Sequence, residues 1–372
     1  MFLTIVVFLL ILSVLVLIHE AGHFFMAKKF GIKVEEFGFG LPPRIFGKKI
    51  GETIYSLNWL PIGGFVKLYG EDEAGGGRVK TTKDQRPKTN DQMNRAFFAR
   101  PIWQRAIIVG AGVAMNFLLA VVIISYLFGV VGVGIPGNKV IIAGVAKDAP
   151  AYKAGFMIGD TIENINDVRI TDTAQLIEIT KNHLGKNITV KIIRDSQEKI
   201  INIEPRKTYP KNEGPMGIAI TQNVEIKKYP WYEAPIVGTK EALKNSWLII
   251  KGLGMVVYGL FIQGTLPKDV AGPIGIAQLT GQVVTMGALA TLSFVSLLSL
   301  NLAILNILPI PALDGGRLFF IVIEAVTRKK VNQRFEAWAH TVGMVILLTL
   351  VAVITVHDLI RVITGQPILP TQ

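Results

Sequence analysis

The residues best suited to chemistry form the pentapeptide His19-Glu20-Ala21-Gly22-His23, which follows seventeen apolar or neutral residues. In a helix, residues i and i+4 lie on the same face, so His19 and His23 can direct two imidazoles at one metal ion, with Glu20 beside it. In this H-E-x-x-H pattern the glutamate activates a water that the metal polarises. The alternative is a set of solvated polar residues at a helix end. It is disfavoured because such groups beside a membrane-length apolar run are costly without a partner.

Composition indicates a membrane protein with sizeable water-facing parts. Half of the 372 residues are hydrophobic, 18% are charged, and the mean hydropathy is +0.45. The chain has no cysteine, so any zinc ion must be held by histidine and carboxylate ligands. We assign the net charge of +12 to basic loops near anionic lipid rather than to nucleic acid.

The first apolar segment is predicted to be a retained transmembrane helix over residues 1–26. It lacks the basic start and the small-x-small cleavage site of a signal peptide. Fifteen Lys and Arg lie between Lys28 and Arg105, so the positive-inside rule places the loop 27–105 in the cytoplasm. The N-terminus is then extracytoplasmic, and the metal motif lies near the cytoplasmic face.

Two β-rich runs in this loop predict a hairpin. Residues 37–40 lead into residues 54–69, with a Pro/Gly turn signal at residues 61–64. We expect the apolar hairpin to dip toward the membrane. It is either purely structural or it offers an edge strand to an unwound substrate. The candidate substrate-binding residues of that strand are Gly64, Phe65 and Val66. The Gly-rich stretch from Glu71 to Asn90 predicts a mobile linker.

A second apolar run predicts a transmembrane helix over residues 106–131. Its Asn116 is interpreted as the donor or acceptor of an interhelical hydrogen bond. Residues 132–208 then alternate like soluble strands. Residues 149–162 carry a Pro-Ala-x-x-Ala-Gly…Gly-Asp-x-Ile pattern that resembles a bacterial PDZ domain. PDZ domains bind extended peptides by strand addition, and a cap that only excludes bulky substrates is the alternative.

The missing metal ligand is predicted in a third transmembrane segment, residues 288–323. Two histidines and a water leave a tetrahedral zinc site one protein ligand short. Asp314 and Arg317 are the only charged residues in this segment. A carboxylate in such surroundings needs a partner, either a metal or Arg317. Pro309 and Pro311 are expected to break the helix, so that the chain can approach the metal.

The membrane topology of the remaining segments is constrained by the metal site, because its three ligands must lie on the same side of the membrane. A membrane crossing at residues 241–262 would place Asp314 on the opposite face from His19 and His23. We therefore predict an amphipathic, surface-lying helix there. The other predicted segments are an extracytoplasmic or membrane-surface region at 209–287, a cytoplasmic loop at 324–338, a fourth transmembrane helix at 339–362 and a tail at 363–372. His340 and His357 flank the fourth helix and are expected to be interfacial polar residues.

The combination resembles the site-2 protease family of intramembrane zinc metalloproteases, in its bacterial RseP-type branch. The resemblance rests on the pentapeptide, the Gly38/Gly40 loop, the hairpin from Leu60 to Tyr69, the PDZ insertion, Gly272-Pro273-Ile274-Gly275-Ile276, and Asn306…Leu313-Asp314-Gly315. It implies one catalytic Zn²⁺ held by His19, His23 and Asp314, with Glu20 as the base. It also implies that Asn306 contacts substrate or steadies the transition state.

The sequence departs from that family in two places. We find one PDZ domain, whereas well-known members carry two. The family's Gly-Pro-x-x-Asn on the second helix is here Gly112-Val113-Ala114-Met115-Asn116. The first difference concerns substrate gating, and neither difference alters the expected chemistry.

The sequence therefore predicts a polytopic α-helical protein of the bacterial cytoplasmic membrane with four transmembrane helices, a cytoplasmic membrane-associated β-hairpin and one extracytoplasmic PDZ domain. Both termini are expected outside the cytoplasm. The expected activity is hydrolysis within single-span membrane proteins that another protease has already trimmed, such as anti-sigma factors or signal-peptide remnants. A metal transporter would need ligands along a pore, which the three other histidines do not provide. A scaffold with structural zinc would leave Glu20 without a role.

Overall fold

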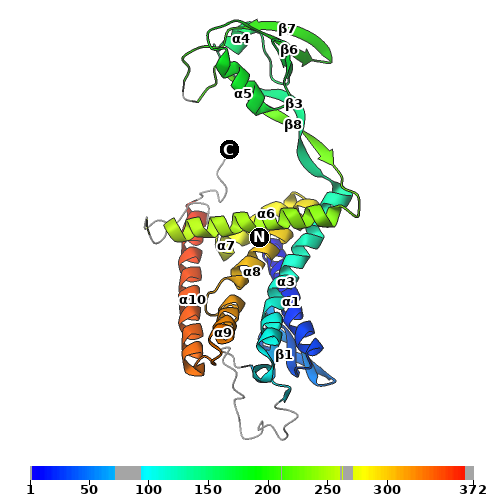
Figure 1. The fold of residues 1–372 in the computed structure, drawn as a ribbon, viewed down its shortest axis with the longest axis vertical. Coiled ribbons are helices and arrows are strands. Elements are labelled where there is room, and N and C mark those ends of the chain that lie inside the picture. Colours follow the sequence, from blue (N-terminus) through cyan, green and yellow to red (C-terminus); the bar gives the residue numbers. More distant parts are fainter. Residues whose placement is uncertain (1, 72–93, 211, 260–261, 263–270, 365–372) are drawn as a thin grey trace. The chain divides into compact units, whose positions relative to one another are not determined.

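The computed structural model describes residues 2–71, 94–210, 212–259, 262 and 271–364 (Figure 1). They divide into two compact units. One comprises Met1–Leu127 with Pro230–Gln372, and the other is Phe128–Tyr229. The predicted linker, apart from Glu71, and the predicted tail from residue 365 onward lie outside the described residues.

Among the described residues, four helices are long and apolar enough to cross a membrane. These spans are Leu3–Lys29, Ile102–Val131, Ala288–Ile307 and Arg334–Ile363, which agrees with the four spans predicted from sequence. They correspond to α1 (Phe2–Lys29), α3 (Ile102–Tyr126) with the π-helical turn η2 (Leu127–Val131), α8 (Ala288–Ile307) and α10 (Gln333–Ile363). A short 3₁₀ turn, η1 (Phe97–Ala99), precedes α3.

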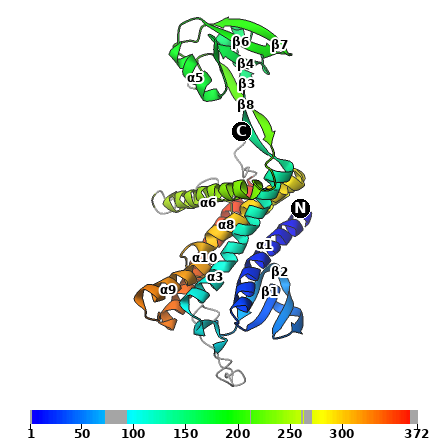
Figure 2. The ribbon, with the colours of Figure 1, turned by 45° about the vertical axis from the view of Figure 1, so that its right-hand side comes forward.

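Helices α1, α3 and α8 pack side by side (Figure 2). The contact between α1 and α3 depends on Gly22, because a Cβ there would clash with the carbonyl oxygen of Ala111. Small residues permit this close approach of helix backbones in membranes. On the other side of α3, the Ser299 hydroxyl of α8 donates a hydrogen bond to the Asn116 carbonyl at 2.7 Å. The helix with the metal motif is thus fixed against a central helix.

The predicted third segment, residues 288–323, consists of two helices in the structure. Helix α8 ends at Ile307, and α9 (Asp314–Thr327) starts after an irregular connection. The predicted effect of Pro309 and Pro311 is confirmed, since neither can continue a helical hydrogen-bond ladder. The connection folds back tightly, because a Cβ at Gly315 would clash with the carbonyl oxygen of Leu308. Asp314 therefore begins a new helix.

The hairpin is formed by β1 (Val34–Ile50) and β2 (Thr53–Leu68). Its turn lies at Gly51–Glu52, so the predicted turn at residues 61–64 is wrong. Residues 61–64 bend β2 instead, with Gly63 at φ +81°. Because of the bend, β2 pairs with β1 twice: Phe37 lies opposite both Tyr55 and Val66. The predicted substrate-binding residues lie on the second of these two pairings.

The second unit is a six-stranded antiparallel sheet with two helices. Its strands are β3 (Val133–Val145), β4 (Thr161–Ile165), β5 (Val168–Arg169), β6 (Ile188–Arg194), β7 (Gln197–Ile203) and β8 (Ile218–Lys227). The order is β7-β6-β4-β3-β8, with β5 paired to β4. Helices α4 (Pro150–Ala154) and α5 (Thr173–Asn182) complete the unit.

The predicted end of this domain at residue 208 is wrong. Strand β8 pairs with β3 from Val145↔Ile218 to Val133↔Lys227. Between β7 and β8, the described residues 204–210 and 212–217 form no strand, so β8 is not adjacent in sequence to the rest of the sheet. Long-range pairing of this kind is set by tertiary structure rather than by local sequence.

The Gly-Asp-x-Ile pattern of this unit has a structural role. Asp160 accepts hydrogen bonds from Arg194 Nε at 2.6 Å and Nη2 at 2.7 Å, and from the Met157 amide at 2.8 Å. Burial by itself would raise the pKa of Asp160, but Arg194 and the Met157 amide outweigh it and lower that pKa overall. The carboxylate ties the loop before β4 to β6.

Two further helices belong to the first unit, α6 (Ala234–Tyr258) and α7 (Pro273–Thr285). In Figure 1, α6 lies across α3 and α10 rather than along them. It is not among the four described helices apolar enough to span a membrane. It begins earlier than the predicted residue 241, because Pro235 suits the first turn of a helix. Its position at the membrane surface remains a prediction.

Candidate metal centre

Three predicted ligand residues meet where α1 approaches the start of α9. His19 Nε2 lies 2.8 Å from Asp314 Oδ2, and His23 Nε2 lies 3.2 Å from the same oxygen. The two histidine Nε2 atoms are 3.2 Å apart. Within the described ranges, this is the only group of three or more His, Cys, Asp or Glu whose ligand atoms gather in this way. The structure thus joins residues almost 300 positions apart.

The site fits a zinc ion in donor type and spacing. Two imidazole nitrogens and one carboxylate oxygen form a typical three-ligand set for catalytic zinc. Tetrahedral bonds of about 2.0 Å would place ligand atoms roughly 3.3 Å apart, which is close to the observed spacing. Gly112 of α3 faces these atoms, and a Cβ there would lie 2.7 Å from His19 Cε1 and closer still to His23 Nε2. The absence of a side chain at residue 112 leaves the space clear.

Arg317 pairs with Glu71 in the structure, and not with Asp314, which was the alternative to a metal partner for Asp314. Arg317 Nη1 donates a hydrogen bond to Glu71 Oε1 at 2.8 Å. That ion pair joins α9 to the chain just after β2. Asp314 remains directed at the two histidines.

Glu20 lies beside a small cavity next to the ligand atoms. The cavity measures about 60 Å³, and its lining includes His23, Asp314, Glu71 and Arg317. This volume admits water, since about 15 Å³ of such space suffices for one molecule. The Val66 amide of β2 donates a hydrogen bond to Glu20 Oε2 at 3.1 Å. The glutamate is thus held by the hairpin at the edge of the ligand cluster.

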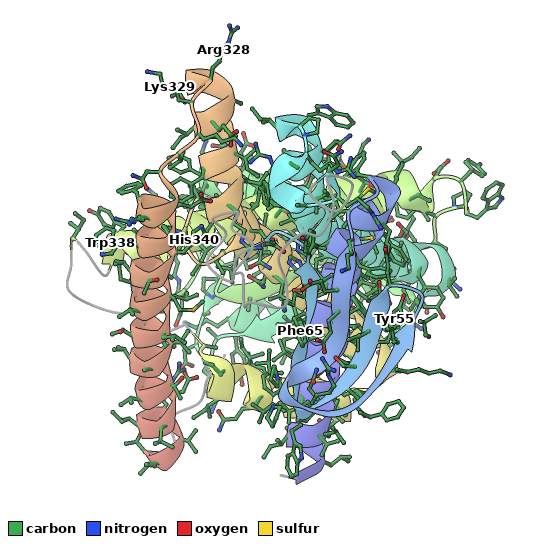
Figure 3. All side chains as sticks on the ribbon, turned by 90° about the horizontal axis from the view of Figure 1, so that it is seen from below. Tyr55, Phe65, Arg328, Lys329, Trp338 and His340 are labelled. Atoms are coloured by element: carbon green, nitrogen blue, oxygen red, sulfur yellow. The ribbon has the colours of Figure 1, made fainter. Side chains whose placement is uncertain are left out.

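The other predicted site residues also lie nearby. Asn306, at the end of α8, places its Nδ2 3.4 Å from His19 Nε2. Gly64 lies against Gly38 and α1, with its hypothetical Cβ 3.9 Å from Glu20 Cγ. The Phe65 ring covers Gly38, where any Cβ would clash with it; Figure 3 labels Phe65 on the hairpin beside α1.

His340 differs from its predicted role as an interfacial polar residue. Its side chain is buried, and Nδ1 accepts a hydrogen bond from the Ala312 amide at 2.9 Å. Figure 3 shows it on α10. Ala312 has φ +83°, a strained conformation for a residue with a Cβ. His340 therefore stabilises the connection that carries Asp314, a role that its place in the sequence does not reveal.

The sequence marks Gly112 only through the motif at residues 112–116, and it gives no signal for the contact of Gly112 with the histidines, for the Glu71–Arg317 pair or for the Ile108 carbonyl. The last of these accepts a hydrogen bond from His23 Nδ1 at 2.8 Å. The effect of these groups on the site depends on how the helices pack, which local sequence does not specify.

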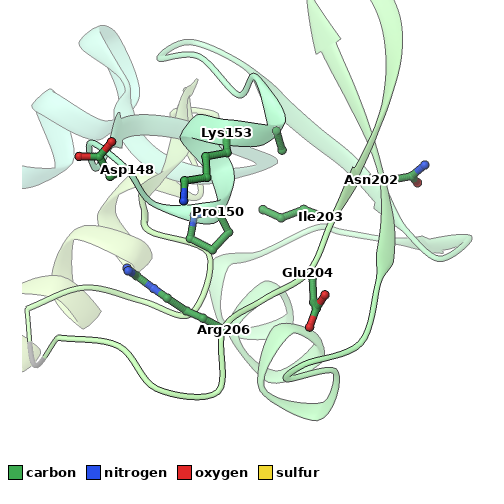
Figure 4. A pocket seen from close by; sticks show the side chains of 8 residues that line it. Asp148, Pro150, Lys153, Asn202, Ile203, Glu204 and Arg206 are labelled. Carbon is green, nitrogen blue, oxygen red and sulfur yellow. The ribbon is translucent and has the colours of Figure 1, made fainter.

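The second unit contains two pockets of a different kind. One measures about 460 Å³ and is lined by Asp148, Lys153, Asn202, Glu204 and Arg206, among others (Figure 4). No predicted site residue lines it. The other is a smaller apolar pocket of about 60 Å³ between α5 and β8, with Leu176, Ile177 and Met216 in its wall. Strand β8 lies at one end of the strand order of the sheet.

The sequence is similar to known proteins over nearly its whole length. The profile of Peptidase family M50 matches residues 7–350. The regulator of sigma-W protease RasP of Bacillus subtilis is 30% identical over 96% of this chain and 98% of its own. A putative zinc metalloprotease of Clostridium perfringens is 33% identical over 95% and 97%.

Among solved structures, the PDZ domain of an SdrC-like protein from Listeria monocytogenes matches 24% of this chain and 94% of its own. The identity is 18% and the TM-score 0.21. An HtrA-type protease, AlgW, solved with a decapeptide, matches 20% of this chain and 23% of its own, with 24% identity and a TM-score of 0.19.

We expect Gly112→Ala to abolish zinc binding, because the added methyl group would occupy the space next to both ligand nitrogens. Gly110→Ala is the matched control on the same helix, since a Cβ at Gly110 meets nothing within 4 Å. Zinc content of the two purified variants, measured by elemental mass spectrometry, tests this. Equal zinc in both variants would contradict the placement of the metal between these residues.

Proposed function

This chain belongs to peptidase family M50, and from that premise we propose that it cleaves single-span membrane proteins within or near their transmembrane segment, using the cluster of His19, His23 and Asp314 with Glu20 beside it. It is a zinc metalloendopeptidase of the site-2 protease type. The convergence of the three ligand atoms beside Glu20 is the observation that carries the proposal.

The proposed ligands are His19, His23 and Asp314. When bound there, zinc supplies a Lewis acid that polarises the scissile carbonyl and acidifies water. Glu20 acts as the general base: it removes a proton from the attacking water and later delivers it to the leaving amide nitrogen. Water adds across the C–N bond, so one carboxylic acid and one amine result. The cavity beside Glu20 holds the water in reach of its carboxylate.

Asn306 is proposed to act on the substrate carbonyl. Its NH₂ group lies next to His19 Nε2 and therefore close to where a scissile carbonyl would bind. A donor placed there can stabilise the negative charge that develops on the carbonyl oxygen. This role would be exerted in the transition state rather than in metal binding.

The hairpin is proposed to hold the unwound substrate. A helical substrate hides its carbonyls in hydrogen bonds, so cleavage requires an extended stretch. The segment with Gly64, Phe65 and Val66 is the part of β2 nearest Glu20. Pairing along this segment would bring an extended peptide to the base.

The class of substrate is supported by one relative's name, regulator of sigma-W protease. We infer that anti-sigma factors or signal-peptide remnants, already trimmed by another protease, are substrates here. The PDZ-like unit either binds their new termini at the pocket between α5 and β8 or excludes untrimmed proteins. Binding of such a peptide to residues 128–229 would favour the first role, and its absence the second.

We expect Glu20→Gln to abolish cleavage and to leave zinc content unchanged, because it removes the base but none of the proposed ligands. The measurement compares cleavage of a pre-trimmed single-span reporter in cells that express either form at equal level. Cleavage that persists in the variant would mean that Glu20 is not the base or that another enzyme acts. Absence of cleavage in both forms would direct the next test to the PDZ-like unit.

Proline substitutions along residues 64–69 should impair cleavage without lowering zinc content. Proline removes a backbone donor that a paired peptide would use. Reporter cleavage and zinc content are measured on each variant, with thermal melting as the control for folding. Unchanged cleavage in all well-folded variants would refute pairing with the substrate.

We also propose an orientation in the bacterial cytoplasmic membrane. Arg328 and Lys329 project from the end of α9 (Figure 3), and the positive-inside rule assigns them with Lys330 to the cytoplasm. Both termini are then extracytoplasmic and the site lies near the cytoplasmic side. The chain has no cysteine, so single cysteines introduced at residue 330 and at the C-terminus can be labelled selectively. They should label from opposite sides, and labelling from one side would overturn the orientation.

A further inference from the structure

Asn116 is a fully buried polar residue of α3 that the proposed function leaves without a role. It lies four residues after Gly112, so both residues occupy the same face of the helix. Gly112 faces the two histidines, since a Cβ there would clash with both rings. Asn116 therefore points toward the same cluster.

The Asn116 carboxamide lies next to Nδ1 of His19, the ring nitrogen that faces away from Asp314. Its Nδ2 is placed 3.5 Å from His19 Nδ1. Its Oδ1 is buried and has no hydrogen-bond partner among the described residues. A buried amide oxygen without a donor is costly, so this arrangement of the amide is unfavourable.

The chemistry of His19 decides how the amide must be oriented. The Nε2 of His19 faces Asp314 and His23 Nε2, so it is the nitrogen that would hold the metal. A ligating nitrogen carries no hydrogen, and the neutral ring then carries its hydrogen on Nδ1. An N–H group can donate to an oxygen but not to the NH₂ of an amide.

Turning the amide by 180° resolves the conflict. Oxygen and nitrogen of a carboxamide have nearly the same shape, and their assignment follows from hydrogen bonding. After the turn, Oδ1 accepts the Nδ1–H of His19. The NH₂ group then has no hydrogen-bond partner among the described residues, but the donor–donor contact and the orphan oxygen are both removed.

Helix α3 also accepts a hydrogen bond from Nδ1 of His23, the second proposed ligand histidine. His23 Nδ1 donates to the Ile108 carbonyl at 2.8 Å. Ile108, Gly112 and Asn116 are spaced by four residues and form one stripe of α3. Outer-nitrogen hydrogen bonds of this type fix the tautomer and the ring orientation of metal ligands.

The position of Asn116 is fixed independently of its side chain. The Ser299 hydroxyl donates to the Asn116 backbone carbonyl at 2.7 Å, and Ser299 itself is fully buried. This bond joins α8 to α3 at the same residue without involving the carboxamide. Removing the Ser299 hydroxyl therefore tests the effect of helix packing separately from that of the Asn116 carboxamide.

We propose that Asn116 is a positioning residue for the metal centre: its carboxamide oxygen accepts the Nδ1–H of His19 and holds the His19 Nε2 lone pair toward the metal. The inference rests on the proposed role of His19 as a ligand. It gives the Gly-x-x-x-Asn motif of α3 one function, with Gly112 making space and Asn116 orienting the ring.

The test measures zinc affinity of the full-length protein in detergent by competition with a chromogenic chelator. Asn116→Leu removes the acceptor at similar volume and should weaken zinc binding about 10- to 100-fold. Asn116→Asp keeps an acceptor oxygen and should restore affinity to within a few-fold of the wild type. Asn116→Ala serves as a second variant without added bulk if the leucine variant does not fold.

Ser299→Ala is the control for packing and should leave zinc affinity within a few-fold of the wild type. The visible absorption spectrum of the Co²⁺-loaded protein gives a second readout. We expect it to change in Asn116→Leu and to match the wild type in Ser299→Ala.

Three outcomes would overturn the proposal: wild-type affinity in Asn116→Leu, no restoration by Asn116→Asp, or equal losses in Ser299→Ala and Asn116→Leu. Zinc retained at full affinity in His19→Ala would instead show that the proposed ligand set is wrong.

Discussion

The close approach of α1 to α3 is the constraint on which the rest of the structure depends. Gly22 lets α1 lie against the backbone of α3, and Gly112 keeps α3 from filling the space in front of His19 and His23. With larger residues at either position the helices would separate, and the ligand atoms would no longer face Asp314. Helix packing in lipid has little hydrophobic driving force between helices, so such small-residue contacts largely determine how near two helices come.

Several polar groups around the centre are hydrogen-bonded across elements, which lowers the cost of burying them in a low-dielectric surrounding. Arg317 pairs with Glu71, His340 accepts the Ala312 amide, and Ser299 donates to Asn116. Each contact joins two elements that are distant in sequence, and each lies next to the metal ligands or to the connection that carries Asp314. The broken segment between α8 and α9 is tolerable because Gly315 packs against that connection and α10 braces it.

Two strand edges make the protein suited to extended peptides. One is the second half of β2, whose Val66 amide contacts Glu20. The other is β8, beside the apolar pocket of the second unit. The two edges belong to different units, so the roles proposed for them, presenting the scissile bond and binding or excluding a substrate terminus, are separate.

The sequence by itself determined the chemistry: the i, i+4 histidines with Glu20, the lone carboxylate Asp314 in an apolar segment, and the four spans follow from local spacing and composition. It also predicted the helix break at Pro309 and Pro311, because proline acts locally. The turn at Gly51–Glu52, the strand β8 and the buried role of His340 were decided only by tertiary structure. Strand pairing and helix contacts join residues that are far apart along the chain. No local pattern specifies which of several glycine-rich stretches forms the hairpin turn, or which apolar faces pack together. The proposed metal centre shows both cases: its proposed ligands can be identified in the sequence, whereas the contacts of Ile108, Gly112 and Asn116 with the two histidines appear only when the helices are packed.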